Sequence, residues 1–177
     1  LYQAALRLAL RAGRPVVVDS RHRMGVFPGA TLLTPNVAET EEAVGRKIVT
    51  EEDLIGAGWS LMARLKPRGL LITRGPDGMS LFLPDGSLTH IPAANRQEVF
   101  DVSGAGDTVV AAAALGLAAG LEMLPSARLA NFAAGVVVRK MGTAAVTPEE
   151  LRRAIGKSAE NGAGWPIAPA IGLGAQN

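Results

Sequence analysis

Apolar residues along the chain occur in two patterns. Short uninterrupted apolar runs predict buried β-strands, and longer stretches in which apolar residues recur every three or four positions predict helices packed on a core. In the first part of the chain the expected strands span 15–19, 30–34 and 69–73, and the expected helices span 1–12, 37–44 and 51–65. Alternating strands and helices of this length favour a parallel sheet covered by helices.

The pattern changes after Thr73. Two apolar segments, 79–83 and 88–91, flank the turn-forming residues Pro-Asp-Gly-Ser, which predicts a β-hairpin. Three helices are expected next, at 105–119, 126–140 and 148–155, with glycines after their ends.

These elements predict one α/β domain over 1–156, with a mostly parallel sheet flanked by helices and a β-hairpin. From 157 to 177 the composition turns to Gly, Ala and Pro without any period, which predicts a tail. The first residues have the pattern of the middle of an amphipathic helix and no Met precedes them, so we expect a fragment or an internal start.

Composition and charge exclude several classes of protein. With 48% hydrophobic and 19% charged residues, the chain has enough apolar material for a packed core. It has no cysteine and two histidines, which excludes disulfides, a thiolate nucleophile and Cys-ligated zinc. The net charge is +2 and the basic residues are scattered, so no nucleic-acid partner is expected. The apolar stretch at 108–121 is shorter than the about 20 residues of a membrane span, so we expect no membrane partner and a cytoplasmic location.

The segment 101–108, Asp-Val-Ser-Gly-Ala-Gly-Asp-Thr, joins extended sequence to an Ala-rich helix. Gly104 and Gly106 permit backbone conformations that a Cβ would forbid, so the N–H groups at the helix start can converge on a phosphate. The positive end of the helix adds to this attraction and favours the ionised carboxylate of Asp107. A carboxylate beside a phosphate makes sense as a base that takes a proton from an attacking hydroxyl. The alternative is that two glycines and an aspartate only cap the helix.

This segment resembles the D-x-x-G-A-G-D-T signature of the ribokinase-like (PfkB) carbohydrate kinases. Residues 34–39 (Thr-Pro-Asn-Val-Ala-Glu) are similar to the N-x-x-E element of that family, and residues 73–78 (Thr-Arg-Gly-Pro-Asp-Gly) to its T-x-G-x-x-G nucleotide loop. Segments 29–45 and 130–151 resemble in particular the bacterial D-glycero-β-D-manno-heptose 7-phosphate kinases. The resemblance implies a ribokinase-like fold, of which the chain holds the C-terminal, ATP-binding and catalytic part.

The resemblance also implies roles for single residues of this signature. Asp107 is expected to be the general base on the acceptor hydroxyl. The backbone N–H groups of Gly104, Ala105 and Gly106 are expected to form the anion hole around the transferring phosphoryl group, and Asp101 to brace the loop.

Asn36 and Glu39 are expected, on the same resemblance, to help hold Mg²⁺ and phosphate oxygens through water. The two residues also fit a capping box for the helix that begins at Val37. We expect both roles.

The nucleotide site is implied at three further places. Thr73, Gly75 and Gly78 are expected to approach the ATP phosphates closely, although Gly78 fits an ordinary turn into the hairpin equally well. Asn131 and Ala134 match positions that line the adenine and ribose site. Gly142 lies near the position where family members bind a monovalent cation through carbonyl oxygens.

Residues outside these motifs carry weaker expectations. Asp19 or Arg21 is expected to touch phosphate, although the relatives read D-P-K where this chain has Asp-Ser-Arg. His22 and His90 are interpreted as solvated residues rather than catalysts. The two tryptophans, Trp59 and Trp165, are expected to be packing residues.

The motifs together predict ATP-dependent phosphoryl transfer to a hydroxyl of a sugar or sugar phosphate, with heptose 7-phosphate as the acceptor that the resemblance suggests. The alternatives are a nucleoside or small-alcohol kinase of the same fold, and a non-catalytic nucleotide-binding remnant. In the family most sugar-contacting residues lie N-terminal to the matched region. An exposed sheet edge and apolar patch then predict either a homo-oligomer or association with a separate N-terminal half.

Overall fold

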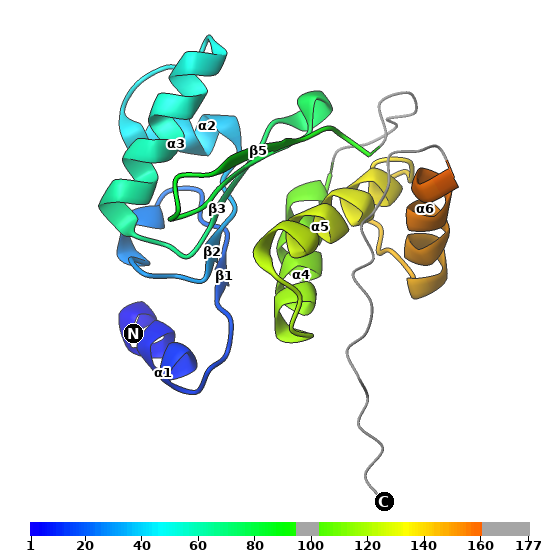
Figure 1. The fold of residues 1–177 in the computed structure, drawn as a ribbon, viewed down its shortest axis with the longest axis horizontal. Helices are drawn as coiled ribbons and strands as arrows, with labels where there is room; N and C mark the ends of the chain where they lie inside the picture. The colour runs from blue at the N-terminus through cyan, green and yellow to red at the C-terminus, as the bar shows by residue number, and fades with distance from the viewer. Residues whose placement is uncertain (95–102, 161–177) are drawn as a thin grey trace, which may run out of the picture.

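The computed structural model describes residues 1–94 and 103–160. Within them a five-stranded sheet has the strand order β1-β2-β3-β4-β5 (Figure 1). Strands β1 to β3 are parallel, and β4 and β5 pair antiparallel. The bounds are Val17–Val18 for β1, Leu32–Leu33 for β2, Leu70–Thr73 for β3, Met79–Phe82 for β4 and Leu88–Ile91 for β5. The predicted parallel strands and hairpin are confirmed, and the hairpin extends the same sheet, which is therefore mixed.

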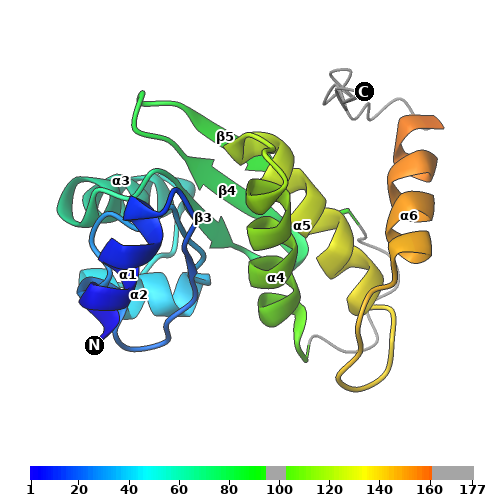
Figure 2. The same ribbon diagram turned by 90° about the horizontal axis from the view of Figure 1, so that it is seen from below.

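Helices lie on both sides of this sheet (Figures 1 and 2). One side carries α1, α2 and α3, and the other carries α4 and α5, with α6 packed on α5. The bounds are Tyr2–Arg11, Val37–Val44, Glu51–Leu65, Ala105–Ala118, Met123–Val137 and Pro148–Glu160 for α1 to α6, with short 3₁₀ turns at Met24–Val26 and Gly75–Asp77.

Side-chain alternation along the strands builds one core on each side of the sheet. Leu70 and Ile72 of β3 are fully buried in the core that contains residues of α3, whereas Leu71 between them is fully buried against residues of α4 and α5. Trp59 of α3 packs edge-on against Phe82 with ring centroids 5.1 Å apart, which confirms its packing role. Trp165 lies outside the described residues.

Small residues allow α4 and α5 to approach closely. A Cβ on Gly116 of α4 would lie 2.9 Å from Oγ of Ser126 on α5, closer than such atoms can approach. Both helices contribute fully buried alanines, including Ala113 and Ala130. The start of α4, where the signature motif lies, is therefore held on a rigid pair of helices.

Side-chain capping sets the start of two helices on the same side of the sheet. Capping boxes start α2 at Asn36 and α3 at Thr50, so both helices have the predicted bounds. The predicted end of α6 is wrong, because the helix continues through Gly156 to Glu160. Gly156 does not adopt the left-handed conformation that ends helices, and a glycine inside a helix costs only about 1 kcal/mol relative to alanine.

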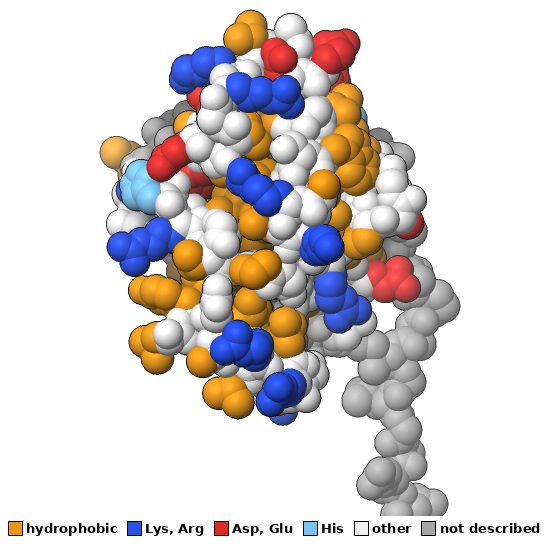
Figure 3. All heavy atoms as spheres, turned by 90° about the vertical axis from the view of Figure 1, so that its left-hand side faces the viewer, with side chains coloured by type: hydrophobic (Ala, Val, Ile, Leu, Met, Phe, Trp, Pro, Cys, Tyr) orange, Lys and Arg blue, Asp and Glu red, His pale blue; other side chains and the backbone are white. Residues whose placement is uncertain are grey.

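The outer surface near the N-terminus is partly apolar. Figure 3 shows orange side chains gathered toward its lower end, the level at which α1 lies in Figure 1, with Lys and Arg side chains spaced among them. Tyr2 and Leu8 of α1 are 54% and 67% exposed. Strand β1 forms one edge of the sheet, so the predicted association of this edge with further chain stays a prediction. Among the described helices, none has the length and apolar character needed to cross a bilayer.

Candidate active site

The carboxyl ends of the three parallel strands deliver polar residues to one edge of the sheet. Asp19 follows β1, Asn36 follows β2, and Thr73 ends β3. An isolated parallel bridge joins Asn36 to Thr73, which fixes these two loops side by side. The start of α4 faces the same edge, because a Cβ on Gly106 would lie 3.9 Å from Oδ2 of Asp19.

These loops and the start of α4 enclose a cavity that we call the polar cleft. Its lining includes Asp19, Asn36, Glu39, Gly104, Gly106 and Asp107. The structure therefore brings the expected base and the expected metal-binding pair into one cavity. Arg21 and His22 also line the cleft.

At the start of α4 the conformation expected of the two glycines is found at Gly104 only. Gly104 is the N-cap and is left-handed, with φ of +77°, whereas Gly106 lies inside the helix and a Cβ there would make an ordinary contact. The amide of Thr108 makes the first intrahelical bond, 3.0 Å from the carbonyl oxygen of Gly104. The amides of Ala105, Gly106 and Asp107 precede it, at the positive end of the helix dipole. A phosphate at this point of the cleft is stabilised by the helix end.

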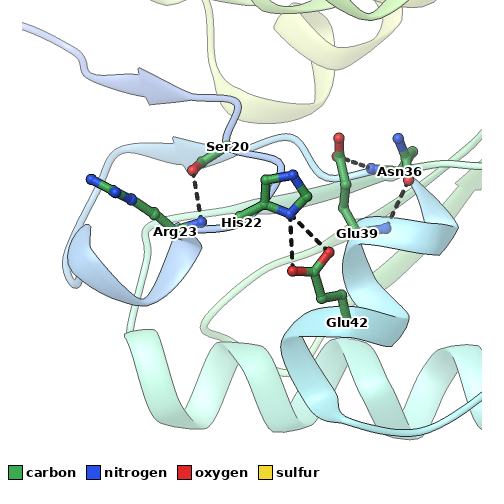
Figure 4. Close-up of polar contacts among 6 residues, drawn as sticks. All are labelled: Ser20, His22, Arg23, Asn36, Glu39 and Glu42. Atoms are coloured by element: carbon green, nitrogen blue, oxygen red, sulfur yellow. Dashed lines mark hydrogen bonds and ion pairs between the residues drawn. The ribbon is translucent and has the colours of Figure 1, made fainter.

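Asn36 and Glu39 form the capping box that the sequence offered as their second role (Figure 4). The amide of Asn36 donates to Oε2 of Glu39 at 2.9 Å, and the amide of Glu39 donates to Oδ1 of Asn36 at 2.8 Å. In the described part of the chain no three His, Asp or Glu side chains are grouped to hold a metal ion directly. Their role toward Mg²⁺ therefore stays a prediction.

The carboxylate of Asp19 is repelled by two neighbouring carboxylates, those of Glu39 and Asp107. Partial burial of its carboxyl group raises its pKa, and the nearby carboxylates of Glu39 and Asp107 raise it further, while Arg21 opposes the shift. The residue as a whole remains exposed, so its withdrawal from water is incomplete. The carboxylates of Glu39 and Asp107 are therefore close enough to act on that of Asp19, and their negative charge attracts cations to the cleft.

A second cavity, which we call the apolar pocket, lies on the other side of the same wall. It shares Thr73 and Gly106 with the polar cleft. The predicted nucleotide residues Thr73, Gly75, Gly78, Asn131 and Ala134 all line it. The structure thus gathers residues from three separate motifs around one cavity.

Asn131 joins the two walls of the apolar pocket. Its side chain is only 7% exposed, and its Nδ2 donates to the carbonyl oxygen of Pro92 at 2.8 Å. This bond fixes α5 to the segment that follows β5. This hydrogen bond therefore holds α5 and the segment after β5 together when no ligand is bound in the pocket.

Gly75 and Gly78 differ in the space that a side chain would have at each position. Both are left-handed, with φ of +57° and +85°. A Cβ on Gly78 would lie 2.0 Å from the carbonyl oxygen of Ile91, whereas a Cβ on Gly75 would meet open space. Gly78 therefore has the close packing expected of a tight turn into the hairpin. It also lines the apolar pocket, as expected of a residue near the nucleotide.

Two predicted residues are not placed in either cavity by the described part of the chain. Asp101 lies outside the described residues, so its role stays a prediction. Gly142 follows α5 in a left-handed conformation and is not among the residues that line the two cavities. Its neighbour Thr143 nevertheless lies beside the signature turn, with Cγ2 3.4 Å from the position of a Cβ on Gly104.

Sequence reasoning missed part of the pocket wall. Ala93 and Ala94 after β5 line the pocket, as do Gly135 and Val138 of the last turns of α5. The spacing of these two residues from Asn131 is that of one helix face, which is the signal that identifies them. Nothing in the sequence marks the two alanines.

The two histidines have different environments. His22 is exposed as predicted, and its Nδ1 lies 3.0 Å from Oε1 of Glu42 (Figure 4). His90 is also exposed as predicted, with 38% of its side chain accessible, but its ring contacts three other side chains, those of Glu51, Arg74 and Ser80.

Comparison with known proteins gives relatives for most of the chain. The sequence model described as pfkB family carbohydrate kinase matches residues 1–150. The chain is 49% identical over 155 residues to the bifunctional protein HldE of Geotalea uraniireducens and 47% identical over 155 residues to that of Pseudomonas syringae pv. syringae. Each match covers 87% of this chain, but only 31% and 32% of those proteins. The chain thus spans about a third of their length.

Solved structures share the fold. The ribokinase of Arabidopsis thaliana, complexed with ribose and ATP, superposes with a TM-score of 0.76 at 23% identity, over 86% of this chain and 51% of that one. The phosphofructokinase-2 of Escherichia coli, in complex with potassium, gives a TM-score of 0.76 at 19% identity, over 86% of this chain and 50% of that one. These neighbours confirm the predicted ribokinase-like fold.

Proposed function

Because the chain belongs to the pfkB family of carbohydrate kinases, we propose that it supplies the nucleotide site and the general base of an enzyme that transfers the γ-phosphoryl group of ATP to a hydroxyl of a sugar or sugar phosphate. The main observation in support of this proposal is that Thr73 and Gly106 line both the apolar pocket and the polar cleft, so the two cavities are adjacent. A nucleotide with its base and ribose in the pocket reaches the cleft with its phosphates. Asp107 lines the polar cleft.

In the proposed reaction the acceptor hydroxyl attacks the γ-phosphorus, the bond from that phosphorus to the bridging oxygen breaks, and ADP leaves. Asp107 accepts the hydroxyl proton as the new bond forms. The amides at the start of α4 stabilise negative charge on the transferring group, as a prearranged anion hole does. Each of these groups acts from a rigid helix end.

Asn36 and Glu39 are proposed to hold Mg²⁺ through bound water. Mg²⁺ gives up its water reluctantly, so a hydrated ion is compatible with a capping box that uses Oε2 of Glu39 and the single side-chain oxygen of Asn36, and leaves Oε1 of Glu39 outside the box. The mutual repulsion of Asp19, Glu39 and Asp107 also favours a cation in the cleft. When bound, the ion supplies neutralisation of phosphate charge. We propose a monovalent cation site near Gly142 only on the family resemblance.

The proposed acceptor is a heptose 7-phosphate. This choice is supported by the resemblance of residues 29–45 and 130–151 to the kinases that act on that sugar. It is also compatible with Arg21, which lines the polar cleft, has a positive charge that acts on Asp19, and can bind a second phosphate group.

The test is a phosphoryl-transfer assay with a panel of acceptors. The chain is first titrated with Mg²⁺ and a non-hydrolysable ATP analogue, and is then incubated with MgATP and heptose 7-phosphate, fructose 6-phosphate, ribose or adenosine. Mass spectrometry identifies the product. Preferential phosphorylation of the heptose supports the proposal, and preferential phosphorylation of adenosine replaces it with a nucleoside kinase. Nucleotide binding without any product, in an assay that also contains the N-terminal sugar-binding part of a relative, contradicts a catalytic role and favours a binding module.

A further inference from the structure

A polar cluster lies behind the loop of residues 73–78, on the α3 side of the sheet. Its centre is His90 of β5, which pairs in register with Ser80 of β4. Nδ1 of His90 lies 2.9 Å from Oγ of Ser80 and 3.1 Å from Nη1 of Arg74, and its Nε2 lies 3.1 Å from Oε1 of Glu51. Ser80 is completely buried.

The partners of the imidazole fix the position of its proton. An arginine guanidinium can only donate hydrogen bonds, so Nδ1 of His90 accepts from Arg74 and carries no proton. Nε2 then carries the proton and donates it to the carboxylate of Glu51. The hydroxyl of Ser80 accepts from Nη1 of Arg74 at 3.2 Å and completes the cluster. The Ser80 hydroxyl, 2.9 Å from Nδ1, shares the one lone pair of that nitrogen with Arg74, so the Nε2–H tautomer pairs a donor with an acceptor at every contact of the ring.

Arg74 links this cluster to the nucleotide loop. It stands between Thr73 and Gly75, which both line the apolar pocket. Its own amide donates to the carbonyl oxygen of Gly78 at 2.8 Å and closes the loop. Anchoring the Arg74 side chain therefore limits the freedom of the backbone on both sides of it.

We propose that His90 is a positioning residue, which as the Nε2–H tautomer holds Arg74 and thereby keeps the loop of residues 73–78 in the shape that receives the nucleotide. The inference rests on the proposed function, because it assigns the nucleotide to the apolar pocket. His90 itself does not line that pocket, so it acts through Arg74.

Two substitutions of His90 test the roles of its two ring nitrogens one at a time. In His90→Asn the side-chain oxygen takes the place of Nδ1 and keeps an acceptor for Arg74. In His90→Gln the longer amide reaches the place of Nε2, keeps the contact with Glu51 and loses the acceptor. Thr89→Val is the matched control, because it alters the neighbouring residue of β5, whose side chain points to the opposite face of the sheet.

The first measurement is the calorimetric affinity for Mg²⁺ and a non-hydrolysable ATP analogue. His90→Gln is expected to weaken binding about tenfold, the order of one lost hydrogen bond to a charged group. His90→Asn and Thr89→Val are expected to bind as the wild type does. Equal affinities for His90→Asn and His90→Gln overturn the proposal.

A second measurement does not depend on nucleotide binding. The ¹⁵N chemical shifts of the His90 ring report which nitrogen carries the proton, and amide hydrogen exchange reports the mobility of residues 74–78. We expect the Nε2–H tautomer, and faster exchange in His90→Gln than in His90→Asn. An Nδ1–H tautomer, or the same exchange in both variants, contradicts the positioning role. If the wild type binds no nucleotide while these expectations hold, the proposed function fails and the anchoring of the loop stands.

Discussion

The apolar pocket and the polar cleft share Thr73 and Gly106 in their linings, but the other side chains that line them differ in polarity. The pocket lies between the hairpin side of the sheet and the facing residues of α4 and α5, and apolar side chains such as Met79, Val109 and Val138 dominate its lining. The cleft lies at the ends of the parallel strands and is lined by carboxylates and an arginine. The first selects by shape and the second by charge, so changes in volume are expected to affect one and changes in charge the other.

The largest effect is expected at the base. Asp107→Asn removes the proton acceptor and keeps the shape of the cleft, so turnover is expected to fall by about 10² to 10⁴-fold. Affinity for the nucleotide is expected to stay unchanged, because the apolar pocket is untouched. Steady-state kinetics and calorimetry measure the two quantities, with Glu149→Gln on the exposed surface of α6 as the control. Near-wild-type turnover in Asp107→Asn excludes it as the base.

A change of volume tests the other cavity. Ala134→Leu places a larger side chain in the apolar pocket and is expected to weaken nucleotide binding about tenfold or more, since a filled pocket loses its ligand contacts. Ala118→Leu, at an exposed position of α4, is the control. Calorimetric titration with the ATP analogue gives both affinities. Unchanged binding in Ala134→Leu contradicts the placement of the nucleotide.

A smaller effect is expected at Glu39. Glu39→Gln keeps the capping box, because glutamine also serves at that position, but it removes one negative charge from the cleft. The Mg²⁺ concentration needed for half-maximal nucleotide binding is expected to rise about threefold, the scale of a partly exposed charge interaction. Asp53→Asn, which alters the capping box of α3 instead, controls for helix stability. An unchanged Mg²⁺ titration leaves Glu39 with its capping role alone.

The smallest effect concerns the pH dependence of stability. Because the folded protein raises the pKa of Asp19 above its unfolded value of 3.8, it binds a proton more tightly than the unfolded chain does. The free energy of unfolding therefore falls as the pH rises from about 3.8 through the folded pKa. Asp19→Asn is expected to remove this loss and stabilise the protein at neutral pH by less than about 1 kcal/mol, since solvent screens the site. Urea unfolding at several pH values tests this, and a destabilised variant at neutral pH contradicts it.

The residues that the sequence motifs single out lie on both sides of the site, in the polar cleft and in the apolar pocket. Asn36, Glu39 and Asp107 follow strands or start helices, and local chemistry determines both their backbone and their direction. Thr50 and Asp53 likewise set the start of α3. Such signals act over three or four residues, so they are visible along the chain.

The remaining features depend on contacts between distant segments. His90 meets Ser80 only through the register of β4 and β5, and Glu51 only through the packing of α3. The contribution of Ala93 to the apolar pocket depends on how the chain leaves β5. Neither could be predicted from local pattern, because a single shift in strand register moves every side chain to the other face.

The most direct test of the shared wall is amide hydrogen exchange of this chain with and without Mg²⁺ and a non-hydrolysable ATP analogue. Protection is predicted to appear together in three segments that are far apart in sequence, namely residues 73–78, 104–107 and 131–138. Protection confined to any other part of the surface, or none at all in a chain that binds the analogue, contradicts the claim that one nucleotide spans the pocket and the cleft.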